Sequence, residues 1–558
     1  MRLRYWIAPI AALVLIVAGW FVVRSGITFR RAPVELTILA LNDFHGNLQP
    51  PPGGIRIADP ADRTKKIQVA AGGAEHLATL VKQRREGKTN SVFVAAGDLI
   101  GASPFLSALF HDEPTIEALS MMGLDVASVG NHEFDEGAKE LIRMQNGGCH
   151  PVDGCKGPHP FLGAKFKYLA ASTVEKATGK TLFPAYEVRE FGGIPVAFIG
   201  LTLKGTPFIV NPDGVAGLEF RDEAQTVNAL IPEIRARGIE AIVVLIHEGG
   251  LPTGDYNDCP GISGPIVDIV KKFDKAVDIV VSGHTHQAYI CNIDGRLVTS
   301  ADKYGTLLTE IDVQLDRKTR DIVSAKAGNT IVRTDLPKEA AQTKLIADYE
   351  VLAKPIASRP AGKITEPLLR DPNRAGESVL GDMIADAQLA ATADPANGGA
   401  VIAITNPGGI RNSIPKNGDG TITYADVFAA QPFRNLLVTM TLTGTQLKQA
   451  LEQQWTAPTF PRILQVSRGF GYRYDATKPI GERVPIETIT LGGVPIEAKA
   501  SYRVTVNDYL SSGGDGFSVF KDGADKRTGV YDVDALDAWL KANSPISPHV
   551  PDRIQRTN

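Results

Sequence analysis

Short apolar runs recur along the first half of the chain and predict buried β-strands. Five of them end at polar side chains: VELTILALND, SVFVAAGD, DVASVGNH, AIVVLIH and DIVVSGHTH. Runs rich in Val, Ile, Leu and Ala are typical of strands that are buried on both faces. Helix-like segments lie between several of them, at residues 73–87, 114–122 and 222–238. The alternation predicts an α/β layered domain, in which ligands bind outside the carboxyl ends of the strands.

A helix-favouring segment follows Asp335 and separates these strands from a second alternating region. Residues 337–357 (PKEAAQTKLIADYEVLAKPIA) place four large apolar side chains at near-helical spacing, namely Leu345, Ile346, Tyr349 and Leu352. Farther on, VIAIT and LLVTMTLTG are strand-like, and residues 446–455 predict a helix. We therefore expect a first α/β domain, a linker helix and a second α/β domain over residues 35–335, 336–360 and 361–550, respectively.

The N-terminus predicts an apolar helix, because residues 5–23 (YWIAPIAALVLIVAGWFVV) carry no charged side chain. A helix of this length spans roughly 28 Å, close to the hydrocarbon thickness of a bilayer. The segment is either a cleaved signal peptide or an uncleaved anchor. The run is long for a signal peptide, and no convincing small-x-small cleavage site follows it. We therefore expect residues 1–30 to associate with the membrane as an anchor, although arginines on both sides leave its orientation open.

Composition narrows the class of the protein only slightly. A chain of 558 residues, 43% of them hydrophobic and 22% charged, predicts two or more globular domains. The net charge of −3 gives no sign of a surface for binding nucleic acid. We expect no nucleic-acid partner, and the oligomeric state stays open.

The chain contains four cysteines, at positions 149, 155, 259 and 291. An even number, with two close together in GGCHPVDGCKG, suits two disulfides in an oxidising compartment. Four reduced thiols, or a zinc site that includes His150 and His159, are the alternatives. Because the N-terminus is of the exported type, we favour disulfides paired as 149–155 and 259–291, in a protein body that faces the periplasm or the exterior.

The polar side chains that follow the five strands form a candidate set of metal ligands: Asp43, His45, Asp98, Asn131, His247, His284 and His286. Each motif alone is weak evidence, since a polar residue after a strand usually belongs to a turn or caps a helix. Their coincidence is far more informative. Five of the ten histidines lie in these motifs, and the others, at positions 76, 111, 150, 159 and 549, receive a structural interpretation.

The chemistry of this set points to divalent transition metals. Mixed oxygen and nitrogen donors without thiolate suit Zn²⁺, Mn²⁺, Fe or Co, and they do not suit calcium. The number of donors exceeds what one tetrahedral ion requires. Two ions bridged by a carboxylate would use all of them, and such a pair is typical of phosphoester hydrolysis.

Taken in order, DFHGN, GDLIGAS, GNHEFD, the strand-end His247 and GHTH resemble the calcineurin-like metallophosphoesterase superfamily. GNHEFD is similar to the 5′-nucleotidase branch, which includes 2′,3′-cyclic-nucleotide phosphodiesterases and UDP-sugar hydrolases. The resemblance implies a four-layer α/β sandwich for the first domain. It also implies that one metal is held by Asp43, His45 and His286. The second would be held by Asn131, His247 and His284, with Asp98 bridging the two.

The same resemblance implies a catalytic dyad of His132 and Asp135 beside the metals. His132 would stabilise charge on the transferring phosphoryl group or assist the leaving oxygen, and Asp135 would orient its imidazole. A histidine at position 286 is more similar to the wider superfamily than to the nucleotidase branch, where an amide is common. For Glu133 and Glu136 the sequence indicates no role in the chemistry. A negative charge that stabilises the N-terminus of a helix is a sufficient explanation of both.

In the second domain, aromatic and glycine-rich loops alone would be read as ordinary turns and core packing, but the resemblance implies that they form a nucleotide pocket. Two aromatic rings on separate loops can sandwich a nucleobase. NPGGIR is similar to the NGGGIR of the nucleotidase C-terminal domain, which implies phosphate binding by Arg411. QPF and NDYLSSGGDGF match the two base-stacking positions of the family, and they imply a clamp of Phe433 and Tyr509. Asn406 and Asp515 would contact the nucleoside. For a further phosphate-binding arginine of the family, the nearest candidate is Arg374.

The sequence therefore predicts a dinuclear metal-dependent hydrolase that converts 5′-nucleotides to nucleosides and phosphate by metal-activated hydroxide. A 2′,3′-cyclic-nucleotide phosphodiesterase or a nucleotide-sugar hydrolase would use the same site and is the alternative. A thiosulfate-ester hydrolase of similar architecture is disfavoured by the paired base-clamp positions. A non-catalytic nucleotide-binding protein is disfavoured because all seven ligand positions are filled.

Overall fold

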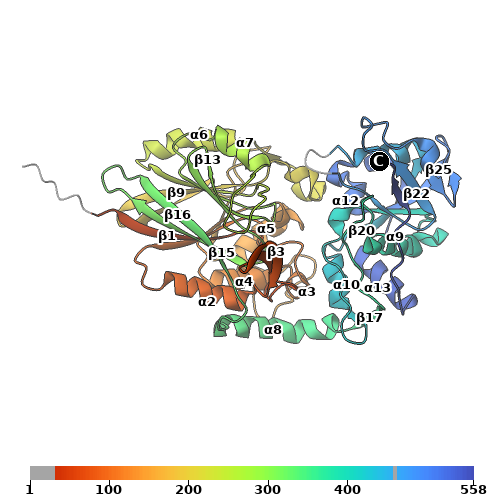
Figure 1. Cartoon of the computed structure of the whole chain (residues 1–558), viewed down its shortest axis with the longest axis horizontal. Helices are drawn as coiled ribbons and strands as arrows, with labels where there is room; N and C mark the ends of the chain where they lie inside the picture. Colours follow the sequence, from red (N-terminus) through yellow and green to blue (C-terminus); the bar gives the residue numbers. More distant parts are fainter. Residues whose placement is uncertain (1–31, 457–460) are drawn as a thin grey trace, which may run out of the picture.

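The computed structural model describes residues 32–456 and 461–558 as two α/β units joined by a long helix (Figure 1). The segment predicted to act as a signal peptide or membrane anchor, residues 1–30, lies outside the described residues. Within the described ranges, no helix combines the length and the apolar character that crossing a bilayer requires.

The first unit is built on two six-stranded sheets. In spatial order, the first sheet contains β16 (Ile322–Ile331), β15 (Leu307–Leu315), β1 (Val34–Leu41), β4 (Ser91–Ala96), β5 (Val126–Ser128) and β6 (Lys167–Leu169). The second contains β13 (Ala288–Ile293), β14 (Arg296–Ala301), β12 (Ile279–Ser282), β11 (Ala241–Ile246), β9 (Ile194–Leu201) and β8 (Tyr186–Phe191). β1 pairs in parallel with β4, whereas it pairs antiparallel with β15.

The two sheets pack face to face around a core of aliphatic and aromatic side chains, among them Ile38, Val94, Phe198 and Val243. Helices cover the outer face of each sheet. On the first sheet these are α2 (Ala74–Arg85), α4 (Glu113–Met121) and α5 (Ala138–Asn146), and on the second α6 (Glu223–Ala236) and α7 (Pro265–Lys272). The result is the four-layer α/β sandwich that the family resemblance implies. The predicted helices over residues 73–87, 114–122 and 222–238 correspond to α2, α4 and α6.

Several shorter elements complete this unit. They are the hairpin β2 (Ile55–Asp59) and β3 (Asp62–Val69), the pair β7 (Thr173–Glu175) and β10 (Leu218–Phe220), the helix α3 (Phe105–Ala108), and the turns η1 (His132–Phe134), η2 (Thr206–Phe208) and η3 (Pro212–Val215).

The linker helix α8 (Ala340–Ala357) runs along one side of the first unit and reaches the second unit at its C-terminal end (Figure 1). Leu345, Ile346 and Tyr349 are buried, whereas Leu352 is 42% exposed, and Ala353 occupies the packed face in its place. The Tyr349 hydroxyl donates to Glu117 Oε2 at 3.1 Å. Because α8 contacts α2, α3 and α4 in the first unit and α10 in the second, it connects the two cores.

The second unit is a smaller α/β fold. One sheet contains β21 (Gln465–Val466), β18 (Ile402–Thr405), β25 (Ser501–Asn507), β20 (Leu436–Thr443) and β26 (Ala524–Tyr531); another contains β24 (Val494–Pro495), β23 (Thr490–Leu491), β22 (Phe470–Tyr474) and β27 (Ile554–Arg556). The pair β17 (Pro360–Lys363) and β19 (Thr421–Thr423) lies apart from both. The longer helices are α9 (Val379–Thr392), α10 (Tyr424–Ala430), α11 (Gly444–Gln453) and α13 (Asp532–Ala542), with the short α12 (Asp508–Ser511) after β25.

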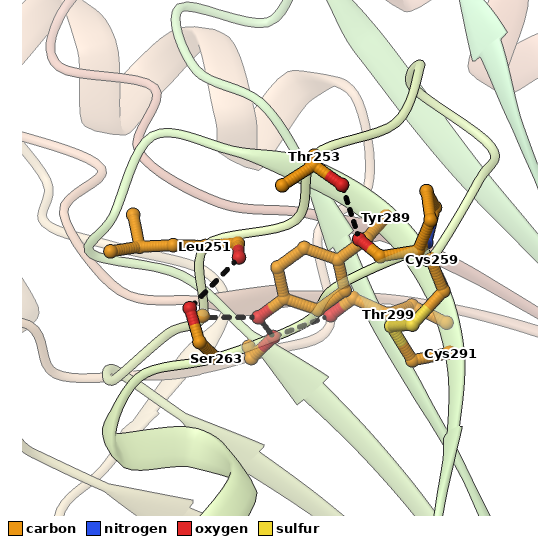
Figure 2. The surroundings of a disulfide bond; sticks show 10 residues. Leu251, Thr253, Cys259, Ser263, Tyr289, Cys291 and Thr299 are labelled. Carbon is orange, nitrogen blue, oxygen red and sulfur yellow. Dashed lines mark hydrogen bonds between the residues drawn. A yellow bond between two sulfur atoms is a disulfide. The ribbon is translucent and has the colours of Figure 1, made fainter.

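The structure confirms the predicted disulfide pairing, Cys149–Cys155 and Cys259–Cys291. Figure 2 shows the second bridge, which joins the loop after β11 to strand β13. Beside it, the Tyr289 hydroxyl accepts a hydrogen bond from the Gly250 N–H at 3.1 Å. Together these contacts hold the loop that leaves β11 against the second sheet.

The loop closed by Cys149–Cys155 is tied to the first unit through His111. His111 Nδ1 lies 2.8 Å from Glu136 Oε2, and its Nε2 lies 3.0 Å from Asp153 Oδ2. Both nitrogens donate only when the imidazole is protonated. Burial lowers the pKa of His111, but the hydrogen bonds and charges of Glu136 and Asp153 outweigh burial and raise it. The cluster is therefore held together by an imidazolium.

This cluster is not arranged as a metal site, although ligand atoms of His111, Glu136, Glu140 and His150 lie within 4.8 Å of one another. The rings of His111 and His150 are parallel, with centroids 3.8 Å apart, so their in-plane lone pairs point side by side and not at a common ion. The Glu140 carboxylate already accepts three hydrogen bonds from Arg143, at 2.6, 2.9 and 3.0 Å. Both histidines therefore make structural contacts here, in the stacked ring pair and in the hydrogen bonds of His111.

We expect the stabilising contribution of His111 to depend on pH. Because its folded-state pKa is raised, the contribution is complete below the ordinary pKa of about 6.5 and is lost as pH rises through the folded-state pKa. His111→Ala should cost about 2 kcal/mol at pH 5.5 and clearly less at pH 9 in urea denaturation. The half-exposed His159 offers a control, since His159→Ala should change stability little. An equal cost of His111→Ala at both pH values would contradict this account.

Candidate functional site

Two sheets deliver the predicted ligand side chains to one edge of the first unit. β1, β4 and β5 are parallel neighbours in one sheet, and β11 and β12 are parallel neighbours in the other. Their carboxyl ends therefore lie together, and the residues that follow them are Asp43, His45, Asp98, Asn131, His247, His284 and His286. The first five of these are buried, and the last two are partly buried.

The backbone turns sharply where these ligands stand. Asp43, His45, Asp98, His284 and His286 all adopt left-handed conformations, with φ between 46° and 69°. Residues other than glycine rarely adopt this region, and such strain concentrates at functional sites. The turns direct consecutive side chains away from the sheet and toward a common point.

Three side chains form a first ligand group. The Nε2 atoms of His45 and His286 lie 3.1 Å apart, and they lie 3.9 and 3.4 Å from Asp43 Oδ1. His45 Nδ1 lies 2.9 Å from the Gly101 carbonyl oxygen and donates to it, so its Nε2 carries a lone pair. Burial holds the pKa of His45 well below its usual range and thus keeps the ring neutral. A divalent cation held by Asp43 and the two Nε2 atoms would fit this arrangement.

A second group contains Asn131, His247 and His284. Asn131 Oδ1 is a buried atom that, within the part of the chain the structure describes, has no hydrogen-bond partner, and His247 Nε2 faces the Asp98 carboxylate at 2.9 Å. His247 Nδ1 lies 2.8 Å from the Ala96 carbonyl oxygen and donates to it. Burial lowers the pKa of His247, but the charge and hydrogen bond of Asp98 at Nε2 outweigh burial and raise it to about 10. A cation bound between Nε2 and Asp98 would take the place of that proton. Burial lowers the pKa of His284 to about 3, so that ring is neutral. A buried amide oxygen that lacks a protein partner and lies beside two imidazoles fits a ligand group for a divalent cation.

Asp98 faces both groups. Its Oδ2 lies 2.9 Å from His247 Nε2 in the second group and 3.6 Å from His45 Nε2 in the first. Its Oδ1 accepts a hydrogen bond from the backbone N–H of His132 at 2.9 Å. The donor set thus fits two cations that share one carboxylate.

The predicted dyad lies beside these groups. His132 Nδ1 donates to Asp135 Oδ2 at 2.8 Å, and the same oxygen accepts the Ala102 N–H at 3.1 Å. Burial lowers the pKa of His132, but the charges of Asp135 and Asp98 outweigh burial and raise it. The imidazole can therefore hold a proton on Nε2 at neutral pH.

A cavity of about 1250 Å³ separates the dyad and metal ligands from the second unit. The predicted residues of the second unit that line it are Asn406, Arg411, Phe433, Tyr509 and Asp515. The Phe433 ring lies parallel to the His132 ring, with centroids 5.9 Å apart and an interplanar angle of 15°. The structure thus brings together residues from both halves of the chain around one cavity.

Tyr509 is held rigidly on its loop. Its hydroxyl donates to Asp515 Oδ1 at 2.9 Å and accepts the Asp515 N–H at 2.8 Å. Its ring lies on Gly514, where an added Cβ would come within 2.4 Å of a ring carbon. Asp515 also accepts from Asn406 Nδ2 at 2.8 Å and pairs with Arg462 at 3.1 Å. In this arrangement Asp515 orients the aromatic ring, and the glycine makes room for it.

Several functional candidates escaped the sequence analysis. Arg370 lines the cavity and donates to the Arg411 carbonyl oxygen, whereas the candidate Arg374 does not line it. The motif LLRDPNRAGE offers both arginines and no signal to choose between them. Arg462 also lines the cavity and lies outside every recognised motif. Glu133 lies in the first turn of η1, where a helix-terminal charge was expected, and it also accepts hydrogen bonds from three backbone N–H groups that the sequence did not reveal.

Comparison with protein families finds two matching models. The calcineurin-like phosphoesterase model matches residues 36–288, and the model for the 5′-nucleotidase C-terminal domain matches residues 360–522.

Two curated relatives match most of this chain. It is 32% identical over 526 residues to the endonuclease YhcR of Bacillus subtilis, and 33% identical over 522 residues to the cell wall protein Lmo0130 of Listeria monocytogenes. These alignments cover 94% and 88% of this chain. They cover 41% and 64% of the relatives, so the chain spans only part of their length.

A solved structure supports the same assignment. The crystal structure of a 5′-nucleotidase precursor from Thermus thermophilus superposes with a TM-score of 0.75 at 27% identity, and covers 94% of this chain and 99% of that one. Both parts of the fold are therefore shared with a nucleotidase. The chain belongs to the calcineurin-like phosphoesterases that carry a 5′-nucleotidase C-terminal domain.

Proposed function

We propose that the protein hydrolyses 5′-nucleotides to nucleosides and phosphate with the help of two divalent cations such as Zn²⁺ or Mn²⁺. The observation that carries this proposal is that one cavity is lined both by metal-ligand and dyad residues and by the aromatic residues Phe433 and Tyr509. A phosphoryl group near the ligands and a base near the aromatic rings would occupy opposite ends of the same cavity.

In the proposed site, Asp43, His45 and His286 would hold one cation, Asn131, His247 and His284 the other, and Asp98 both. Two such cations activate water for attack and offset the charge on the phosphoryl oxygens. The tautomers of His45 and His247 support this assignment, because backbone carbonyls fix Nδ1 as the donor in each ring.

His132 would act on the phosphoryl group through Nε2. Asp135 accepts from Nδ1 and thereby directs the protonated Nε2 toward the cavity. A donor in this place can neutralise charge on a phosphoryl oxygen or protonate the departing nucleoside oxygen. The raised pKa of His132, which Asp135 and Asp98 cause despite burial, keeps that proton available near neutral pH.

Arginine and aromatic side chains would bind the rest of the nucleotide. Arg411 and Arg370 both line the cavity, and the Arg370 guanidinium contacts the Arg411 backbone, so both side chains could bind the oxygens of one phosphate. Tyr509 and Phe433 would stack on the base. Asn406 donates a hydrogen bond to Asp515, and Asp515 accepts another from the Tyr509 hydroxyl. We therefore propose that Asn406 and Asp515 position Tyr509 as well as contact the nucleoside.

We also propose that the protein body faces the periplasm or the exterior, with residues 1–30 as its membrane attachment or signal. Two disulfides support an oxidising compartment. A relative described as a cell wall protein is consistent with this placement.

The proposed function first predicts that hydrolysis depends on metal. Purified protein lacking residues 1–30 should hydrolyse AMP, lose activity in a strong chelator, and recover it with Mn²⁺ or Zn²⁺. Asp98→Asn should lower kcat at least roughly 100-fold, because it weakens the ligand shared by both cations. Phosphate release measures both effects. AMP hydrolysis that persists in chelator would rule out the proposed mechanism.

The second prediction concerns the base clamp. Tyr509→Ala should raise the KM for AMP roughly 10–100-fold, since stacking on a base contributes about 1–3 kcal/mol. Hydrolysis of p-nitrophenyl phosphate, which has no base, should change little and serves as the internal control. The remote Tyr186→Ala should leave both substrates unaffected. Equal losses on AMP and p-nitrophenyl phosphate would show that Tyr509 does not bind the base.

A nucleotide-sugar hydrolase is the second candidate, because the cavity of about 1250 Å³ exceeds the roughly 300–1,000 Å³ typical of small-molecule pockets. We expect kcat/KM to be highest for AMP in a panel with UDP-glucose and 2′,3′-cyclic AMP. A higher kcat/KM for UDP-glucose would replace the mononucleotide assignment, and a higher value for the cyclic nucleotide would favour a phosphodiesterase.

A further inference from the structure

Glu133, in the turn η1, is a buried carboxylate with three backbone partners. It is 2% exposed, and both of its oxygens accept hydrogen bonds. Oε2 accepts the N–H of Gly130 at 2.6 Å and that of Asp98 at 2.9 Å, and Oε1 accepts the N–H of Leu99 at 2.7 Å. The donors belong to two loops, one after β4 and one after β5, which carry the ligands Asp98 and Asn131.

These donors have no strand partner, because the chain leaves both strands at this point. Asp98 has φ of 50°, which turns its N–H and that of Leu99 toward the interior. Buried N–H groups require an acceptor, and a single carboxylate supplies it for both loops. The fit is close, since a Cβ at Gly130 would lie 2.2 Å from Asp98 Oδ1 and 2.9 Å from Glu133 Oε2.

The contact between the two loops is reciprocal. The Glu133 carboxylate binds the backbone of Asp98, and the Asp98 carboxylate binds the backbone N–H of His132 through Oδ1. This pair of contacts fixes the rotation of the Asp98 side chain. Its other oxygen, Oδ2, then faces His247 Nε2 at 2.9 Å and His45 Nε2 at 3.6 Å.

We propose that Glu133 is a positioning residue that orients the shared ligand Asp98, and with it Asn131, so that two cations bind as a coupled pair. The inference rests on the proposed dinuclear site, but it concerns the assembly of that site and not the substrate. Glu133 itself does not join the ligand atoms, because its two oxygens are taken by backbone donors.

Glu133→Gln tests the proposal with almost unchanged side-chain volume. The amide keeps one acceptor oxygen and turns an NH₂ group against at least one backbone N–H. We expect the affinity for the second Mn²⁺ to fall roughly 10–100-fold, as is typical when a partner of a metal ligand is lost. Titration followed by metal analysis should show this fall, and the EPR spectrum should lose the signal of two coupled Mn²⁺ ions. The KM for AMP should stay within about twofold while kcat falls.

Glu452→Gln is the matched control. Glu452 is also buried and accepts backbone N–H groups of Gly481 and Val484, each at 2.8 Å, but it lies in the second unit away from the ligands. The Glu452→Gln substitution should lower the unfolding temperature without changing the Mn²⁺ affinity or the EPR signal. If Glu133→Gln does not fold, Glu133→Asp decides the question, since it keeps the charge but reaches only one loop and should give an intermediate affinity.

Wild-type Mn²⁺ affinity and an intact coupled signal in the folded Glu133 variants would overturn the proposal. A failure of the proposed function would give a different combination of Mn²⁺ binding and nucleotide hydrolysis. A wild-type protein that binds two coupled Mn²⁺ ions but hydrolyses no nucleotide would remove the substrate assignment and leave the role of Glu133 standing. A wild-type protein that binds no coupled pair would contradict both.

Discussion

The rest of the site depends on one constraint: the Asp98 carboxylate lies where the edges of the two sheets come together and faces side chains from both. One of its oxygens lies near a histidine from each ligand group, and the other is bound to the backbone beside the dyad. Because β4 and β11 belong to different sheets, this contact requires the two sheets to pack in one register. The left-handed turns at five ligand positions are retained because the packed sheets enforce them.

The second unit contributes what the sandwich lacks. Its loops bring cationic and aromatic side chains over the ligand edge, with Phe433 parallel to the dyad imidazole and Tyr509 fixed by Asp515. The linker helix α8 contacts helices of both units and therefore sets how the two halves meet. In the proposed function, chemistry and nucleotide recognition are thus divided between two cores that line one cavity.

Much of this arrangement could be predicted from the sequence. Strongly apolar runs identified β1, β4, β5, β11 and β12, and the polar residues at their ends identified the side chains that the structure brings together at one edge, because both signals are local. The fold class followed from the alternation of strands with helices. Other features depend on distant backbone atoms. Glu133 acquires its role from N–H groups 34 and 35 positions earlier, and the choice between Arg370 and Arg374 depends on the path of a loop. Helical spacing also does not reveal which of several adjacent apolar residues faces the core, and in α8 Ala353 is buried while Leu352 is exposed.

The central claim is that two cations share Asp98 at the edge of the sandwich. Anomalous diffraction from crystals grown with Mn²⁺ tests it most directly, because it locates the ions without reference to activity. The account predicts two anomalous peaks roughly 3.5–4 Å apart, both adjacent to the Asp98 carboxylate. A single peak, or two peaks of which one lies away from Asp98, would contradict it.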